Sequence, residues 1–236
     1  MQVHKFRVHI LRYTGSHLGP WQPSARSGTA TMAQHNAPPE QHISEDLSSL
    51  DQVQARSSRD RSLLESCIRA SLASESLAIK LFEGQRRISR QRPDLKLLQE
   101  QEQEHLAQLK RLAPEHRARP SLLAPMLSAL GSALGVAAAA APKELHGAIT
   151  GGAQEALTEH YNDQLRDLRA AGLAEEAGEF RDVLRQMRDG ERAPLNHAQV
   201  PDIMALRNME HLSVSEGVAG VVKYSVKGLL GLAYKV

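Results

Sequence analysis

The sequence has a single cysteine, few aromatic residues and almost no excess of either charge. Because Cys67 has no cysteine partner in the chain, an internal disulfide and a cysteine-rich metal site are both excluded. Only 3% of the 236 residues are aromatic, which argues against aromatic-rich sandwiches and barrels. The net charge is +2 without a concentrated basic patch, so no nucleic-acid partner is predicted. Any metal must therefore be held by carboxylates and imidazoles.

Acidic residues are missing from the start of the chain, where the first Asp or Glu is Glu40. The preceding segment carries Lys and Arg among Ser, Thr and Gly, and its apolar residues recur at helical spacing, as is typical of an organelle transit peptide. A plain disordered tail is the alternative, although a tail has no reason to exclude acids. We expect a mitochondrial transit peptide at 1–39, a disordered linker at 40–58 and a helical domain at 59–236.

After the linker, apolar residues recur at helical spacing, and polar residues interrupt the apolar stripes of two predicted helices. Glu75 lies within the stripe of the first helix, and Glu102 and His105 lie one turn apart within the stripe of the second. A carboxylate on an apolar face is costly unless a cation compensates it, and this ligand set suits iron or manganese. Two alternatives stay open: a neighbouring arginine such as Arg119 compensates Glu75, and the Glu-x-x-His pair is a chance occurrence.

The later helices repeat this arrangement incompletely. The helix predicted at 143–171 carries Gln154 on its apolar face, and the next helix has an apolar heptad that ends in Glu191 and Pro194. Glu191 alone is also consistent with a surface residue at a helix end. In four-helix carboxylate metal proteins, two helices each give one Glu and two others each give Glu-x-x-His, all pointing inward. The first half fits this scheme fully and the second half partly, so we predict an all-α, ferritin-like four-helix bundle.

Two further segments suggest additional membrane-associated helices. Residues 121–142 contain no charged side chain, but glycines, a proline and an alanine run make the segment weakly hydrophobic. We therefore expect a short helical hairpin, buried or entering one leaflet, rather than a membrane span. Residues 217–236 combine apolar side chains with three lysines, which suits an interfacial helix whose lysines snorkel; a final bundle helix is equally consistent. We expect the two segments to lie close together.

Five runs of the sequence are distinctive: ASLASESLAIKLFEGQ, EQEHL, RARPSLLAPMLSALGSALG, TEHYNDQLRDL and RDGE. In this order and at these separations, over about 67–192, they resemble the demethoxyubiquinone hydroxylases of ubiquinone biosynthesis. The resemblance implies two iron ions and hydroxylation of a polyprenylated quinol with dioxygen and electrons ultimately from NADH. It also implies a peripheral position on the matrix side of the mitochondrial inner membrane, and a biosynthetic complex with a lipid-binding accessory protein.

Residue by residue, the resemblance implies metal ligands at Glu75, Glu102, His105 and Glu191. Gln154 stands where the family has a bridging Glu, and Pro194 stands where it has its second His. Gln offers only a neutral oxygen and Pro offers no ligand, so we expect a weakened second metal position, with His197 as a substitute if the chain folds back. His160 and Tyr161 match a His-Tyr pair near the quinone pocket. Two functions stay open: an active hydroxylase, or a catalytically impaired scaffold that binds quinone and lipid.

Overall fold

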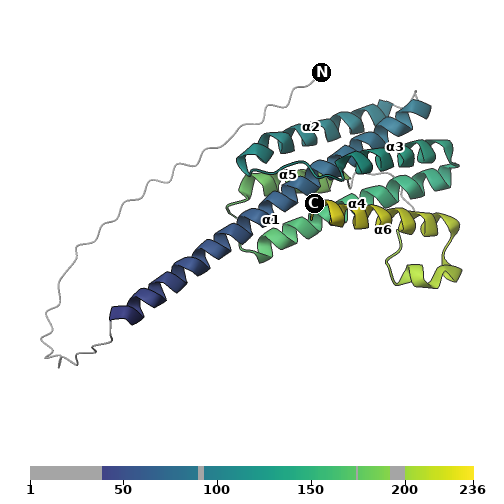
Figure 1. Ribbon diagram of the computed structural model, residues 1–236. Helices are drawn as coiled ribbons and strands as arrows, with labels where there is room; N and C mark the ends of the chain where they lie inside the picture. The colour runs from purple at the N-terminus through teal and green to yellow at the C-terminus, as the bar shows by residue number, and fades with distance from the viewer. Residues whose placement is uncertain (1–38, 90–92, 174, 192–199) are drawn as a thin grey trace, which may run out of the picture. The chain divides into compact units, whose positions relative to one another are not determined.

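The computed structural model describes residues 39–89, 93–173, 175–191 and 200–236 (Figure 1). The expected transit peptide, except its last residue, lies outside the described residues, as do Pro194 and His197. Within the described residues the chain forms α-helices and one 3-10 helix, and no strand. This confirms the predicted all-α class.

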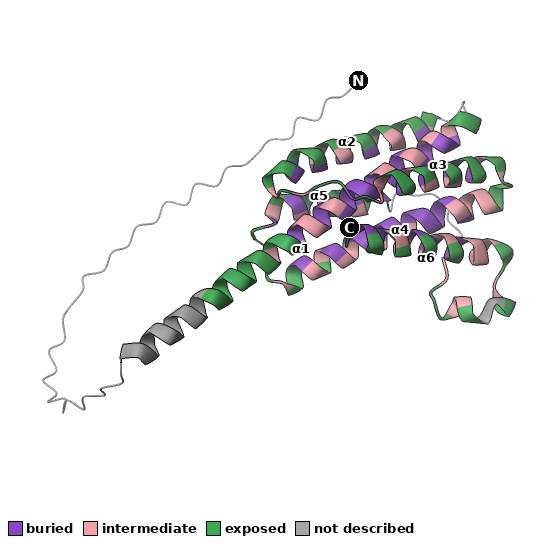
Figure 2. Cartoon of the chain, viewed as in Figure 1, coloured by how far each residue is buried: buried purple, intermediate pink, exposed green. Residues whose placement is uncertain are grey.

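The first helix, α1 (Pro39–Ile88), begins before the predicted start at Arg59. The structure therefore corrects the expected disordered linker at 40–58, because this segment is helical. Its side chains from 51 to 58 are all exposed (Figure 2), so this part of α1 has no buried face and no apolar periodicity that would mark it as a helix. The strong helix formers in it, among them Gln, Ala and Arg, are the signal that the compositional reading overlooked.

Four helices form the core: α1, α2 (Pro93–Glu115), α4 (Lys143–Ala170) and α5 (Gly178–Glu191). Helix α5 packs against both α2 and α4, and side-chain contacts join α1 to α2 and α4. The buried apolar side chains form one cluster, which includes Ile68, Leu77, Leu109, Leu157, Phe180 and Leu184. The predicted four-helix bundle is therefore confirmed.

Residues 121–142 form one helix, α3 (Ala124–Ala140), and not the expected hairpin. Gly131 and Gly135 do not break this helix but bring it close to α1, because a Cβ at either position would collide with a main-chain carbonyl oxygen of α1. Glycine is thus needed here for close approach of two backbones rather than for a turn. None of the helices in the described ranges combines the length and apolarity needed to cross a membrane.

The last helix, α6 (Val214–Ala233), packs along α4 and begins with a capping box formed by Ser213 and Glu216. Its Lys223 and Lys227 do not snorkel toward a membrane surface, because each forms an ion pair of 2.6 Å with Glu159 of α4. The interfacial interpretation of these two lysines is therefore wrong, and α6 is the final bundle-packed helix that the alternative described. Lys227 Nζ also lies 3.4 Å from Asp163 Oδ2, so two carboxylates of α4 balance the two lysines within the fold.

The two apolar segments meet at one end, as expected, because the Leu122 amide donates a hydrogen bond of 3.2 Å to the Val236 carbonyl oxygen. Several large apolar side chains of these segments are exposed: Leu122, Met126, Val136, Val221, Leu232 and Val236. Exposed apolar side chains that adjoin one another are typical of a binding surface. Attachment of this surface to a membrane stays a prediction.

Candidate metal centre

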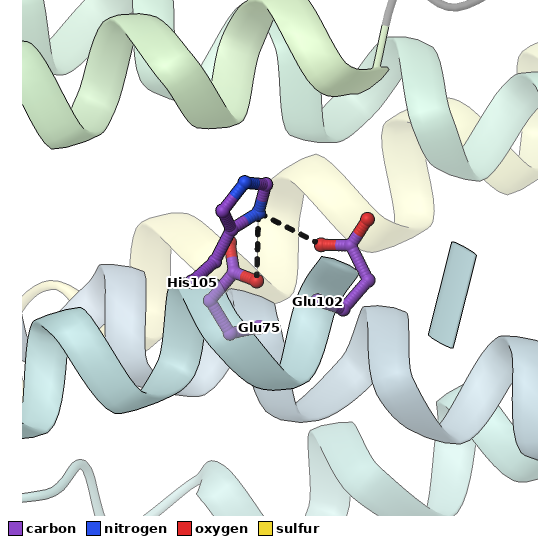
Figure 3. Close-up of side chains that lie close together, drawn as sticks. All are labelled: Glu75, Glu102 and His105. Carbon is purple, nitrogen blue, oxygen red and sulfur yellow. Dashed lines mark hydrogen bonds and ion pairs between the residues drawn. The ribbon is translucent and has the colours of Figure 1, made fainter. Parts of the chain in front are cut away.

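Three predicted ligand residues converge in the interior of the bundle (Figure 3). Glu75 comes from α1, and Glu102 and His105 come from α2. His105 Nδ1 lies 3.3 Å from Glu102 Oε2 and 3.8 Å from Glu75 Oε2. One ligand atom of each residue lies within 4.8 Å of the others, and all three side chains are buried. The expected convergence is confirmed, and the alternative partner Arg119 is instead exposed.

Tyr161 of α4 fixes the orientation of the Glu75 carboxylate. The phenol donates a hydrogen bond of 2.6 Å to Glu75 Oε1, while Glu75 Oε2 has no hydrogen-bond partner in the described part of the chain. Burial, and then the neighbouring Glu75 charge, raises the pKa of Tyr161 well above its usual range, so the phenol stays protonated. Sequence reasoning missed this contact, although Tyr161 lies seven residues after Gln154 on the same helix face.

The ionised form of the Glu75 carboxylate is poorly stabilised by its surroundings. Burial raises the pKa of Glu75 well above its usual range, and the adjacent Glu102 carboxylate raises it further. An ionised carboxylate removed from water and placed beside a second one is destabilised unless a cation lies between them. The unpartnered Oε2 and the nearby imidazole leave the donor atoms for such a cation on one side of Glu75. This set therefore fits one metal ion.

The second half of the centre is also buried but differs in its donor atoms. Gln154 of α4 and Glu191 at the end of α5 are each 4% exposed. Gln154 Oε1 and both Glu191 carboxylate oxygens have no hydrogen-bond partner among the described residues. A Cβ at Gly190 would lie 3.4 Å from His105 Cε1, so the end of α5 lies beside one of the first three ligands. Gln154 points inward as predicted, whereas its neighbour Glu155 is only half-buried.

The electrostatics of Glu191 connect the two halves. Burial, and then the charge of Glu102, raises the pKa of Glu191 well above its usual range. The Gln154 amide lowers this pKa, although neither Glu191 oxygen forms a hydrogen bond of normal geometry in the described part of the chain. The described residues thus offer nitrogen and oxygen donors in the first half and only oxygen donors in the second. The residues described do not complete the ligand set for two irons.

The two predicted substrate-binding residues, His160 and Tyr161, point to different parts of the structure. Tyr161 faces the metal centre, whereas His160 lines a cavity of about 170 Å³ between α4 and α6, together with Asp163, Lys227 and Tyr234. His160 Nε2 lies 2.8 Å from the Gln164 amide nitrogen, and burial lowers its pKa to about 4. The imidazole is therefore neutral near pH 7. A role in substrate binding stays a prediction for both residues.

Comparison with known proteins identifies relatives over most of the folded region. The family described as ubiquinone biosynthesis protein COQ7 matches residues 62–227. The chain is 34% identical over 134 residues to the mitochondrial NADPH-dependent 3-demethoxyubiquinone 3-hydroxylase of Dictyostelium discoideum, which covers 56% of this chain and 61% of that protein. It is 30% identical over 183 residues to the protein of the same name in Caenorhabditis elegans, which covers 75% of this chain and 92% of the relative.

A bacterial relative extends the comparison. The chain is 33% identical over 106 residues to the 3-demethoxyubiquinol 3-hydroxylase of Rhodospirillum rubrum, covering 43% of this chain and 50% of that protein. The chain thus spans less than two thirds of the Dictyostelium and bacterial relatives, and nearly the whole of the nematode one.

Proposed function

This chain belongs to the ubiquinone biosynthesis protein COQ7 family, and we propose that it hydroxylates the ring of a demethoxyubiquinol at the centre formed by Glu75, Glu102 and His105. The observation that carries the proposal is the buried convergence of these three side chains, within the region that matches the family. The names of the relatives supply the substrate class, a demethoxyubiquinone or its quinol. They also specify NADPH, whereas the sequence resemblance implied NADH, so a nicotinamide cofactor is the proposed electron source.

The residues of this chain have distinct parts in the proposed reaction. Glu75, Glu102 and the imidazole of His105 would hold the ion, and the bound iron would supply the chemistry that activates dioxygen. Tyr161 keeps Glu75 Oε1 occupied, which leaves Oε2 for the ion. The apolar side chains of the bundle exclude bulk water from this region. Exclusion of water protects a reactive centre from side reactions.

The test is direct measurement of product. The full chain, loaded with iron, is supplied with a demethoxyubiquinol of short prenyl chain, dioxygen and either NADH or NADPH, and the hydroxylated ring is detected by mass spectrometry. We expect product from the parent and from Glu104→Gln, which changes an exposed glutamate of α2, and none from Glu102→Gln. Equal turnover by Glu102→Gln would remove the proposed centre from the reaction.

A second function is favoured by one specific observation. Gln154 and Pro194 stand where the family pattern has a carboxylate and an imidazole, which suits a catalytically impaired member that binds quinone and lipid in the biosynthetic complex. In the same assay, a folded protein that binds the quinol but yields no product with either nicotinamide cofactor would support this scaffold function.

We further propose that the chain lies peripherally on the matrix side of the mitochondrial inner membrane and assembles there with a lipid-binding accessory protein. The relatives are named as mitochondrial, and the exposed apolar side chains of α3 and α6 suit a membrane surface. Replacing exposed Leu122, Val221 and Leu232 with Ser should reduce liposome flotation without loss of stability. The matched control replaces exposed Val53 of α1 with Ser and should float like the parent. Buried Leu230 is left unchanged because its loss would unfold the bundle.

A further inference from the structure

The second half of the centre has unusual buried polar groups. Glu191 is almost wholly buried, and among the described residues neither of its oxygens has a partner; the buried Gln154 carbonyl oxygen also lacks one there. Elsewhere in the same core, Ser71 donates to Gln164 at 2.9 Å, and Gln164 contacts His160 at 2.8 Å. Gln85 Oε1 also lacks a partner among the described residues, but it is a single neutral oxygen, whereas Glu191 has both oxygens of a carboxylate unpaired. Because unpaired buried polar groups are costly, these oxygens indicate a place for a ligand rather than a packing defect.

The position of these oxygens restricts that ligand. Glu191 is the last residue of α5 and directly follows Gly190, where an added Cβ would lie 3.4 Å from His105 Cε1 of α2. Three acceptor oxygens that are unpaired among the described residues therefore lie near a region that already contains a second buried carboxylate. A second anion or a neutral acceptor would be repelled there, whereas one cation would satisfy all of these groups at once.

The donor atoms determine which cations suit the site. Carboxylates, amide carbonyls and water suit hard ions such as Mg²⁺ and Mn²⁺, whereas imidazole favours iron, zinc and copper. Among the described residues, the only imidazole near the centre is that of His105, on the Glu75 side. Replacing a bridging carboxylate with the neutral Gln154 also lowers the negative charge and weakens the hold on any second ion.

We propose that Glu191, Gln154 and Glu102 form a second, all-oxygen cation position that takes a hard divalent ion, Mn²⁺ or Mg²⁺, beside an imidazole-bound ion. The centre is therefore mixed in metal rather than a pair of equivalent irons. This inference rests on the proposed centre of Glu75, Glu102 and His105. It concerns metal occupancy, which is measured independently of hydroxylation.

The experiment uses the metal-free full chain. One equivalent of Zn²⁺ is added to fill the imidazole-containing position, and Mn²⁺ is then titrated and followed by electron paramagnetic resonance. We expect one further Mn²⁺ to bind, excess Mg²⁺ to displace it, and neither ion to release the Zn²⁺. Glu191→Gln should weaken Mn²⁺ binding by at least about tenfold without changing Zn²⁺ affinity, and Gln154→Glu should tighten it by a similar factor.

Control variants separate the possible failures. Glu155→Gln, which removes the neighbouring half-buried carboxylate, should leave both ions bound as in the parent. The proposal is overturned if no Mn²⁺ binds beside Zn²⁺, if Glu191→Gln retains it fully, or if His197→Ala weakens it, since the site would then contain a nitrogen ligand. If Glu191→Gln does not fold, Gln154→Glu still tests the proposal: tighter Mn²⁺ binding supports it, and unchanged Mn²⁺ binding overturns it. Unchanged Zn²⁺ affinity in His105→Ala would instead contradict the proposed function.

Discussion

The two halves of the centre are both buried, but they offer different donor atoms to a metal ion. The α1 and α2 half brings Glu75, Glu102 and His105 within reach of one ion, and Tyr161 orients one of the carboxylates. The α4 and α5 half contributes an amide and a carboxylate, whose oxygens have no partner among the described residues. Burial is therefore retained where part of the ligand chemistry has changed. The comparison shows that the bundle keeps buried polar side chains at corresponding positions while the donor atoms that they offer differ.

The largest expected effect comes from removing the one imidazole that faces the ion. His105→Ala should lower the affinity for the first ion by more than about 100-fold and abolish hydroxylation, because a direct ligand is lost and two buried carboxylates are left uncompensated. Iron content by elemental analysis measures the first effect. The control is His116→Ala, a half-buried histidine just beyond the end of α2, which should retain the parent iron content.

Restoring the second half should remove the difference between the halves. The paired change Gln154→Glu with Pro194→His supplies the carboxylate and imidazole of the symmetric four-helix pattern. We expect iron stoichiometry to rise from about one to about two per chain, with faster quinol hydroxylation. Two irons and equally fast turnover in the parent would show that Glu155 or His197 serves as a ligand.

The pH dependence of the free energy of unfolding, measured on the metal-free protein, tests whether the buried carboxylates of both halves lack a compensating positive charge. The pKa values of Glu75 and Glu191 are raised in the folded state, so the folded protein binds more protons than the unfolded chain above the ordinary glutamate pKa of about 4.3. The free energy of unfolding should therefore fall as pH rises from about 5 to 8. Glu191→Gln should flatten this dependence in urea titrations. Divalent ions should stabilise more at pH 8, because binding displaces protons. A free energy that rises over this range would contradict the raised pKa values.

The smallest expected effect concerns the orientation of Glu75. Tyr161→Phe removes the donor to Glu75 Oε1 and should cost about 1–3 kcal/mol of stability, since a buried acceptor is left unpaired. Thermal unfolding with and without metal measures the cost. Tyr224→Phe is the control, because Tyr224 is only half-buried and Phe retains the ring beneath Lys223. Equal losses in both variants would mean that the Glu75 contact is not important for stability.

Several features of the fold depended on contacts that no periodicity encodes. The exposed part of α1 at 51–58 lacks an apolar stripe, so its helicity was missed. Gly131 and Gly135 suggested a break in 121–142, but they allow α3 to approach α1 closely. Lys223 suggested a membrane surface until Glu159 was found on the facing helix. For α3 and for Lys223, the contacting residue lies far away in the sequence. For 51–58, no buried face exists that would produce an apolar pattern.

The sequence by itself determined the bundle, the family resemblance and the inward direction of Glu75, Glu102, His105 and Gln154, because a polar residue within an apolar helical stripe must be buried when that stripe packs. The direction of Glu191 stayed open, because this residue lies at the end of its helix. Only the tertiary structure decided which buried groups meet. It placed Tyr161 on Glu75, turned His160 toward a separate cavity and left the oxygens of Gln154 and Glu191 without a partner among the described residues. Helical spacing fixes the face on which a side chain lies, whereas the rotation and offset of neighbouring helices fix the atoms it contacts.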